Sequence, residues 1–393
     1  MFKKMLYLEW ASFGNDYVKK ALADKGIELV IYDFPRETED TRGGEELALD
    51  ITRKLMECNA DAVFSLNYFP VAAIACKALN KKYISWTYDS PYIQLYSLTI
   101  EYPTNYAFIF DKAEYLKMRD LGIETVYYLP MAGPCEATKI TDSEHRRYDA
   151  DIAMIGSMYS EKKHRLIRHF EKVDEYTKGY IDGIMKVQQN LFGVSILETS
   201  LTPEIVKNIQ KSCPVISRGD GFEKVEWVLA NYFIARSLTA RERHEYLDEL
   251  SRHFKVALYT HEETPTLPGI DNRGPLDYYS EAPKAMKCAK INLNITLRSI
   301  ITGIPLRVMD IMAAGGFVLT SYQEDMLDFF VPGEDYAYYD SKADLVDKCG
   351  YYLEHEEERE RMARSAHDKV SRMHTYAHRI DKILETASLE NNE

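Results

Sequence analysis

Short apolar runs alternate with amphipathic segments along the first 130 residues. The apolar runs, which we expect to be strands, are Met5–Leu8, Glu28–Tyr32, Ala62–Leu66, Tyr83–Thr87, Ala107–Phe110 and Thr125–Leu129. The amphipathic segments, which we expect to be helices, are Asp16–Lys25, Glu45–Glu57, Val71–Leu79 and Ala113–Asp120. Strands and helices that alternate at this spacing indicate βαβ units around a parallel sheet. The pattern predicts an α/β, doubly wound, Rossmann-like domain over residues 1–135.

The same alternation returns after a polar stretch, Glu136–Arg147, which we interpret as a linker between domains. A strand at Asp151–Ile155 opens the second series, and a helical pattern from about residue 161 to 254 interrupts it. The series resumes with strands at Val256–Tyr259, Ile291–Asn294, Phe317–Thr320 and Tyr336–Tyr338, helices at Tyr278–Met286 and Leu306–Ala314, and two charged helices to the end. We therefore expect a second Rossmann-like domain over residues 148–375, with a helical insertion.

The chain is acidic, with 49 Lys and Arg against 62 Asp and Glu in 393 residues and a formal charge of −13. This balance argues against a nucleic-acid or anionic-membrane surface, so an anionic ligand needs a local cluster of Arg, Lys and backbone N–H groups. The six cysteines are scattered without a CxxC pair, which favours reduced thiols in a cytoplasmic protein over disulfides or zinc. The polar start and the absence of any long apolar run predict neither a signal peptide nor a membrane span.

The most informative block is INLNITLRSIITGIPLRVMDIMAAGGFVLT, residues 291–320. We expect a buried strand, then a loop, then a helix that begins near Pro305 with free N–H groups, which is a phosphate-binding arrangement. Arg307 and Asp310 share a helix face, and Asp310 can accept hydrogen bonds from the two hydroxyls of a ribose. The alternative is a surface ion pair on an ordinary helix. The loop candidates for binding a nucleotide sugar are Arg298, Ser299, Thr302 and Gly303.

Two further segments of the second domain fall at predicted strand ends, where ligands of parallel sheets bind. In Arg273–Tyr279, Arg273 can meet a phosphate, and Gly274, Asp277 and Tyr278 can lie near a base. The alternative is a plain turn in which Asp277 caps the following helix. Gly156 and Ser157 end the first strand and suit a close approach of backbone to a diphosphate.

The first domain offers polar residues for an acceptor. Asp89 follows a predicted strand and is our candidate for a catalytic base, although it can equally cap the turn at Pro91. The other acceptor-side candidates are Asn67, Tyr68, Ser12 and Asn15. Asp149-Ala150-Asp151 has the form of a metal-binding DxD motif, but it precedes its strand, so we expect no metal site there. No His/Cys cluster has metal-ligand spacing.

The motifs YDADIAMIGSMY, RGPLDYY, the 291–320 block and FFVPGEDYAYYD together resemble the glycosyltransferase domain of CgeB/YkvP spore-maturation-type proteins. DAVFSLNYFP and YISWTYDSP resemble the domain of unknown function that often precedes it. The resemblance implies a GT-B fold with the sugar nucleotide on the second domain, the acceptor in the cleft and no metal or other cofactor. It implies Asp310 as the ribose-binding acid, Arg307, Arg298 and Arg273 as phosphate ligands, and a final helix, 376–393, that returns to the first domain.

The chain departs from the related retaining enzymes at one position. Those enzymes carry two Glu residues separated by seven positions, and here Asp310 takes the second place and Thr302 the first. We expect transfer of a hexose from a nucleotide diphosphate sugar, with UDP preferred, to a protein or cell-surface glycan. A non-catalytic binding scaffold in spore or surface assembly and a sugar-nucleotide epimerase are the alternatives. The pattern leaves open whether the insertion binds an acceptor protein or forms a homo-oligomer.

Overall fold

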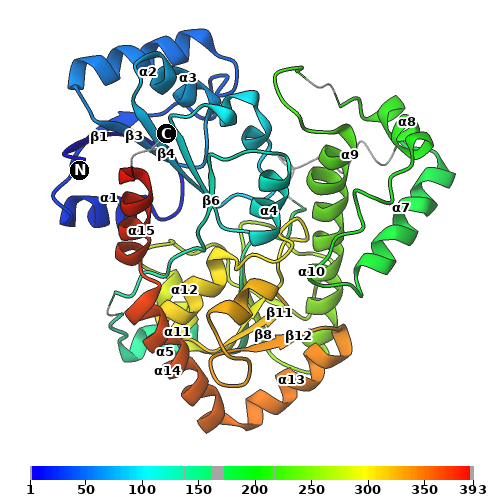
Figure 1. Ribbon diagram of the computed structural model, residues 1–393. Helices are drawn as coiled ribbons and strands as arrows, with labels where there is room; N and C mark the ends of the chain where they lie inside the picture. The colour runs from blue at the N-terminus through cyan, green and yellow to red at the C-terminus, as the bar shows by residue number, and fades with distance from the viewer. Residues whose placement is uncertain (1, 137, 161–171, 216–217, 390–393) are drawn as a thin grey trace. The chain divides into compact units, whose positions relative to one another are not determined.

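The computed structural model describes residues 2–136, 138–160, 172–215 and 218–389 (Figure 1). The chain forms two compact units. Unit 1 comprises Met1–Ala132, Ser217–Glu223 and His374–Glu393, and unit 2 comprises Gly133–Ile216 and Lys224–Met373. Within the described ranges, no helix is long and apolar enough to cross a membrane.

The described part of unit 1 contains a parallel sheet of six strands in the order β2-β1-β3-β4-β5-β6. The strands are β1 (Lys4–Glu9), β2 (Glu28–Asp33), β3 (Ala62–Leu66), β4 (Lys82–Thr87), β5 (Asn105–Ile109) and β6 (Val126–Tyr128). The helices between them are α1 (Asn15–Asp24), α2 (Glu45–Cys58), α3 (Pro70–Ala78) and α4 (Lys112–Asp120). Each predicted strand and helix of this domain is confirmed within three residues at its ends. The central strand β3 is buried at every position because helices cover both faces of the sheet.

The sheet of unit 2 also has six parallel strands among the described residues, in the order β12-β11-β10-β7-β8-β9. They are β7 (Ala150–Ile155), β8 (Val256–Tyr259), β9 (Asp271–Asn272), β10 (Ala289–Asn294), β11 (Val318–Ser321) and β12 (Ala337–Tyr339). The accompanying helices are α11 (Ala282–Cys288), α12 (Leu306–Ala314), α13 (Lys342–Glu354) and α14 (Glu356–Met373). The second predicted Rossmann-like arrangement is therefore confirmed, and the edge strand β9 was not predicted because it is only two residues long.

The predicted linker 136–147 was wrong in part, because it contains the short helix α5 (Asp142–Tyr148). A capping box holds its start: Thr141 accepts from the Glu144 N–H, and Glu144 accepts from the Thr141 N–H. A polar composition hid this helix, since its stability comes from its cap more than from an apolar face.

The described residues of the insertion form helices joined by loops, which confirms the predicted helical character in part, and residues 161–171 and 216–217 of the predicted range lie outside them. Its helices are α7 (Glu175–Gln188), α8 (Pro203–Ser212), α9 (Val225–Val228) and α10 (Ala235–Ser251), with a π-helical turn, Leu229–Ile234, joining α9 to α10. The side chains of Asp174 and Thr202 cap α7 and α8 by accepting from the N–H groups of Thr177 and Ile205, the third residue of each helix.

The chain ends on unit 1 with α15 (Tyr376–Ser388), which lies against α1 (Figure 1). The Gly14 backbone sits so close to the Tyr376 hydroxyl that a β-carbon there would lie 2.7 Å from it. Arg379 donates to the backbone carbonyl of Pro130 at 2.9 Å. Residues 218–223, which follow α8 in the chain, also pack within unit 1, where Arg42 binds Asp220 and Glu223.

Candidate functional site

The loops after β7, β10 and β11 lie at one edge of the unit 2 sheet. All three strands are parallel and neighbouring, so their carboxyl ends point the same way. The residues that lie at this edge are Gly156 and Ser157 after β7, the loop from residue 295 to 305 after β10, and Tyr322 and Gln323 after β11. Open α/β sheets bind their ligands at such an edge, so a ligand site of unit 2 is expected here.

Asp310 and Tyr278 meet in unit 2, as the sequence block and the RGPLDYY segment had suggested separately. The Tyr278 hydroxyl donates to Asp310 Oδ1 at 3.0 Å. Arg307, one turn earlier on α12, lies 3.4 Å from Asp310 Oδ2, which is a long contact. Burial raises the pKa of Asp310 to about 6, against the opposing effects of Arg307 and Tyr278. A carboxylate held this way can accept hydrogen bonds from a ligand's hydroxyl groups.

The amino end of α12 is the anion-binding element of this edge. Pro305 is the N-cap, and within the described chain no side chain caps the helix. The preceding loop is fixed by contacts after β11, because Gln323 Nε2 donates to the Gly303 carbonyl at 2.7 Å and the Asp325 N–H donates to the Thr302 carbonyl at 3.0 Å. Ser299 and Thr302 are buried in this loop. Free N–H groups at a helix start attract phosphate.

The loop after β7 is shaped by Glu262, a residue that sequence reasoning missed. Its carboxylate accepts from the Ser157 hydroxyl at 3.0 Å, from the Ser160 N–H at 2.8 Å and from the Met158 N–H. Burial would raise the pKa of Glu262, but these hydrogen bonds outweigh it and the net shift is downward. Gly156 and Ser157 thus form a fixed backbone surface at the strand end.

Arg243 of α10 connects two of these loops. Its guanidinium donates to the Ser157 carbonyl and, at 2.6 Å, to the Ile295 carbonyl. The side chain is buried, and it stacks near Tyr159 at 4.7 Å from the ring centre. Nothing in the sequence pattern marked Arg243, because its partners lie 86 and 52 residues away.

Arg298 has partners other than the phosphate we predicted. Its Nε donates to Glu242 Oε2 at 2.8 Å, and both side chains are almost fully buried. Its Nη1 and Nη2 donate to the Leu191 and Gln189 carbonyls at 2.9 and 3.1 Å. Burial raises the pKa of Glu242, although the hydrogen bond from Arg298 opposes the shift. The guanidinium is therefore occupied by the insertion, and a phosphate role for it has no support in this geometry.

Arg273 points away from the carboxyl edge, which corrects its predicted placement at the phosphates. It donates to Asp271 at 2.7 Å and to the Asp149 carbonyl, which precedes β7, at 3.1 Å. Asp277 is a turn cap, as the alternative reading had it, since its side chain accepts from the Ser280 N–H at 2.8 Å. Gly274 adopts a positive φ of 77° in the same turn, which suits glycine.

In unit 1, Asp89 follows β4 and lies beside Asn67, which follows β3. Asp89 Oδ2 accepts from Asn67 Nδ2 at 2.8 Å and from Arg36 Nη2 at 2.9 Å. The Asn67 side-chain oxygen accepts from the Tyr88 and Asp89 N–H groups. Asp89 Oδ1 accepts no hydrogen bond from any described residue, so it can accept a proton or a hydroxyl hydrogen bond.

Arg36 and Trp10 belong to this cluster and were not among the predicted site residues. The Arg36 guanidinium lies 3.8 Å from the centre of the Trp10 ring, a cation–π arrangement that fixes its plane. Arg36, Trp10, Asn67 and Asp89 follow β2, β1, β3 and β4, so the four residues gather at one edge of the sheet. Of these four residues, Asn67 and Asp89 were among the predicted site residues, together with Tyr68, Ser12 and Asn15.

The remaining acceptor-side candidates have structural roles within unit 1. Tyr68 is fully buried, and its hydroxyl bonds to Thr99 at 2.8 Å, so an acceptor contact by Tyr68 is not supported. Asn15 is buried and donates to the Trp10 carbonyl at 2.7 Å and to the Ser12 carbonyl at 3.3 Å. Asn15 and Ser12 thus shape the loop that presents Trp10.

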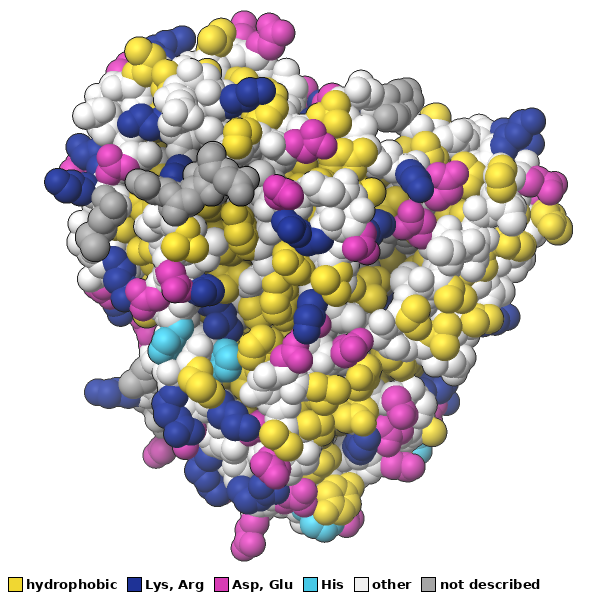
Figure 2. Space-filling model, in the orientation of Figure 1, with side chains coloured by type: hydrophobic (Ala, Val, Ile, Leu, Met, Phe, Trp, Pro, Cys, Tyr) yellow, Lys and Arg dark blue, Asp and Glu magenta, His cyan; other side chains and the backbone are white. Residues whose placement is uncertain are grey.

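Within the described ranges, no group of three His, Cys, Asp or Glu residues could hold a metal ion. Asp149 and Asp151 lie at the amino end of β7, and Asp151 pairs with Lys290 at 2.7 Å. Figure 2 shows basic and acidic side chains interspersed on the face in view, without a broad field of one sign. Independence from metal remains a prediction.

Comparison with protein families matches residues 238–385 to a model described as glycosyl transferase-like. These residues include Arg298, Arg307 and Asp310 of unit 2 and, of unit 1, only residues 374–385. Comparison with curated proteins gives no match.

Three solved structures are similar over nearly the whole length of both chains. HepE of Anabaena in complex with UDP and glucose has a TM-score of 0.56 at 10% identity, covering 99% of this chain and 100% of its own. Sucrose-phosphate synthase of Thermosynechococcus elongatus has a TM-score of 0.54 at 9% identity, with 98% of each chain covered. A glycosyltransferase of Rickettsia africae has a TM-score of 0.50 at 11% identity, with 99% of each covered. The chain has the α/β fold of GT-B glycosyltransferases, and its residues 238–385 match a glycosyl transferase-like model.

Proposed function

We propose that this protein transfers a hexose from a nucleotide diphosphate sugar, UDP-linked by preference, to a hydroxyl of a glycan or protein acceptor. One observation carries the proposal: Asp310 is buried against Tyr278 on a helix whose uncapped amino end lies at the carboxyl edge of the unit 2 sheet. A carboxylate beside a helix amino end suits a ribose diol and a diphosphate, because the carboxylate accepts from the hydroxyls and the free N–H groups bind the phosphates. The matched glycosyl transferase-like segment and the GT-B fold support it.

The main catalytic demand is to stabilise the departing diphosphate. Negative charge develops on the leaving oxygens while the sugar becomes oxocarbenium-like, as in glycoside hydrolysis. The amino end of α12 and Arg307 place positive charge next to the proposed diphosphate position before the reaction begins, so little reorganisation is needed. By this account no metal ion is required.

Asp89 is the proposed base for an inverting transfer. Arg36 and Asn67 both bind its Oδ2, so they fix the carboxylate and leave Oδ1 open for the acceptor hydroxyl. In a retaining transfer the leaving phosphate could take the proton, and Asp89 would then only bind the acceptor.

The likeness of this chain's motifs to CgeB/YkvP-type proteins supports a protein or cell-surface glycan as acceptor, and the scattered cysteines support a cytoplasmic location. A second candidate, a non-catalytic binding scaffold, is favoured by Thr302, which stands where retaining relatives carry a Glu. Both functions need the nucleotide site, and only the transferase releases the nucleotide from its sugar.

Calorimetric titration with UDP, GDP, ADP and dTDP tests the site. We expect selective, micromolar binding of one nucleotide to the wild type and none measurable to Asp310→Ala. Asp151→Ala is the matched control, since it removes an aspartate from the opposite edge of the same sheet. Failure of all four nucleotides to bind would remove the basis of the proposal. Binding without release of nucleotide from any sugar donor would favour the scaffold.

A further inference from the structure

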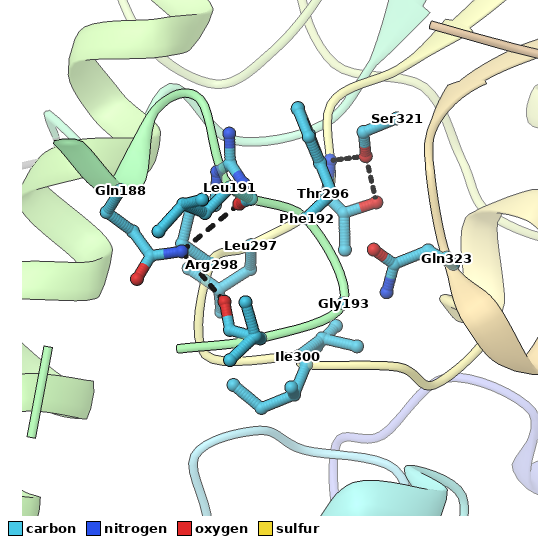
Figure 3. A pocket seen from close by; sticks show the side chains of 12 residues that line it. Gln188, Leu191, Phe192, Gly193, Thr296, Leu297, Arg298, Ile300, Ser321 and Gln323 are labelled. Atoms are coloured by element: carbon cyan, nitrogen blue, oxygen red, sulfur yellow. Dashed lines mark hydrogen bonds between the residues drawn. The ribbon is translucent and has the colours of Figure 1, made fainter. Parts of the chain in front are cut away.

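A small pocket opens at the carboxyl ends of β10 and β11, beside the α12 site (Figure 3). Its space is about 20 Å³, which is room for one water-sized group. Thr296, Ser321 and Gln323 of the sheet edge line one part of it, and Leu191, Phe192 and Gly193 of the insertion line another. The pocket is therefore too small for a sugar ring and large enough for one substituent of a ring.

The wall from the insertion is held in place by two side chains. Arg298 donates to the Leu191 and Gln189 carbonyls, and its guanidinium lies 4.1 Å from the centre of the Phe192 ring. Gln188 Nε2 donates to the Leu191 and Val194 carbonyls at 3.1 and 2.9 Å, as the dashed lines in Figure 3 show. Because these bonds fix the backbone of residues 189–194, the size of the pocket is set by the insertion.

The wall from the sheet edge offers a hydrogen-bond acceptor, the side-chain oxygen of Gln323. Gln323 is 5% exposed, and its Nε2 donates to the Gly303 carbonyl, which identifies the nitrogen of the amide. Its Oε1 accepts no hydrogen bond from any described residue, and Figure 3 shows this oxygen on the pocket side of the side chain. Because this oxygen faces the pocket without a donor from the described residues, a ligand hydroxyl in the pocket can donate a hydrogen bond to it.

The pocket carries no net charge. Arg298 is the charged group among its lining residues, and Glu242 pairs with it on the side of α10. A carboxylate in the pocket would meet the unpaired Gln323 oxygen without a free cation. An apolar methyl group would leave that oxygen unsatisfied, and a hydrogen atom would leave the pocket empty.

We propose that this pocket, completed by the insertion loop 189–194, binds the hydroxymethyl group of the donor hexose. In this proposal the hydroxyl of that group donates a hydrogen bond to the Gln323 side-chain oxygen. The inference rests on the proposed function and sharpens it. The insertion thereby selects a hexose donor over the corresponding pentose and uronate donors. Gln323 is a specificity-determining residue, and Arg298 is a positioning residue that acts through the loop.

The test compares calorimetric affinities of the wild type for UDP, UDP-glucose, UDP-xylose and UDP-glucuronate. We expect UDP-glucose to bind at least about tenfold more tightly than the other two sugars, as sites built around a ligand hydroxyl discriminate strongly against its loss. Equal affinities for the three sugars would overturn the inference even if UDP binds well. Absence of UDP binding would instead defeat the proposed function on which the inference rests.

Two variants locate the discrimination. In Gln323→Met, the preference for UDP-glucose over UDP-xylose should fall below about threefold. Because Gln323 also holds the Gly303 carbonyl, the ratio of the two affinities is compared, with UDP alone titrated beside it. In the double variant Arg298→Gln/Glu242→Gln, which frees the loop without leaving a buried charge, the preference should fall in the same way. Arg273→Gln, which removes an arginine–carboxylate pair at the opposite edge, should keep the wild-type ratio. If Gln323→Met and the double variant both fold and both keep the wild-type preference for UDP-glucose over UDP-xylose, the inference is contradicted.

Discussion

Each unit has its own parallel sheet and one carboxylate at its candidate site, and the two carboxylates differ in their burial and in their partners. In unit 2, Asp310 is 5% exposed and has a pKa raised to about 6 by burial, with a tyrosine hydroxyl as its closest partner. In unit 1, Asp89 has a side chain that is 36% exposed, and it is ion-paired with Arg36. A buried acid with few donors suits stationary binding of ligand hydroxyls. A half-exposed acid with one open oxygen suits the exchange of a proton with an arriving acceptor.

Substitution of Asp89 should give the largest effect on turnover. If Asp89 is the base, Asp89→Asn lowers kcat by about 10²–10⁴-fold, the usual contribution of general base catalysis, and leaves UDP affinity unchanged. The measurement is the rate of UDP release in the presence of an accepted acceptor. An unaltered rate in Asp89→Asn would remove Asp89 from the chemistry and leave a retaining route.

The buried and exposed ion pairs should differ in their contribution to stability. Arg298→Gln leaves Glu242 buried and unpaired, and we expect the free energy of unfolding to fall by about 3–5 kcal/mol. Arg36→Gln removes a half-exposed pair and should cost about 0–1 kcal/mol. Urea denaturation of each purified variant measures both. Similar losses for the two would show that the Arg298–Glu242 pair is less buried than described.

The raised pKa of Asp310 makes donor binding depend on pH. With a pKa of about 6, roughly a tenth of Asp310 is charged at pH 5 and roughly nine tenths at pH 7. Because the charged form accepts the ribose hydroxyls, affinity for UDP-glucose should rise by about tenfold between these pH values. UDP-glucose is the appropriate probe because its diphosphate is esterified at both ends. The rise should vanish in Asp310→Asn, and a rise retained there would assign it to another group.

Arg273 should give the smallest effect. Arg273→Gln removes contacts to Asp271 and to carbonyls that precede β7, far along the strand from its carboxyl end. The dissociation constant for UDP should stay within about twofold, well under the tenfold that 1.4 kcal/mol represents. A large loss on calorimetry would return Arg273 to the phosphates, as the sequence had suggested.

The sequence was most informative where the signal is local. Alternating apolar and amphipathic segments predicted both sheets, because a buried strand is a short apolar run and the helix after it has one apolar face, and both signals lie within a few neighbouring residues. Asp310 and Arg307 were found together because three residues separate them on one helix. The short helix α5 was missed because its signal is a cap, Thr141 with Glu144, inside a polar stretch.

The sequence was least informative where a side chain meets a distant backbone. Arg298 looked like a phosphate ligand by its place in the loop, yet its partners Glu242 and Leu191 lie 56 and 107 residues away. Gln323 and Arg36 carried no motif, and only the folded sheet edges bring them to their sites. Long-range pairing of this kind is a property of topology and leaves no periodic pattern in the chain.

The central claim is that the nucleotide binds unit 2 at Asp310. Amide hydrogen exchange measured with and without saturating UDP tests it directly, because a bound ligand slows exchange in the segments it stabilises. We predict slower exchange in segments 273–280 and 299–314, with no change in segments 62–69 and 85–92. Protection confined to the unit 1 segments, or none in either unit at saturation, would contradict the account.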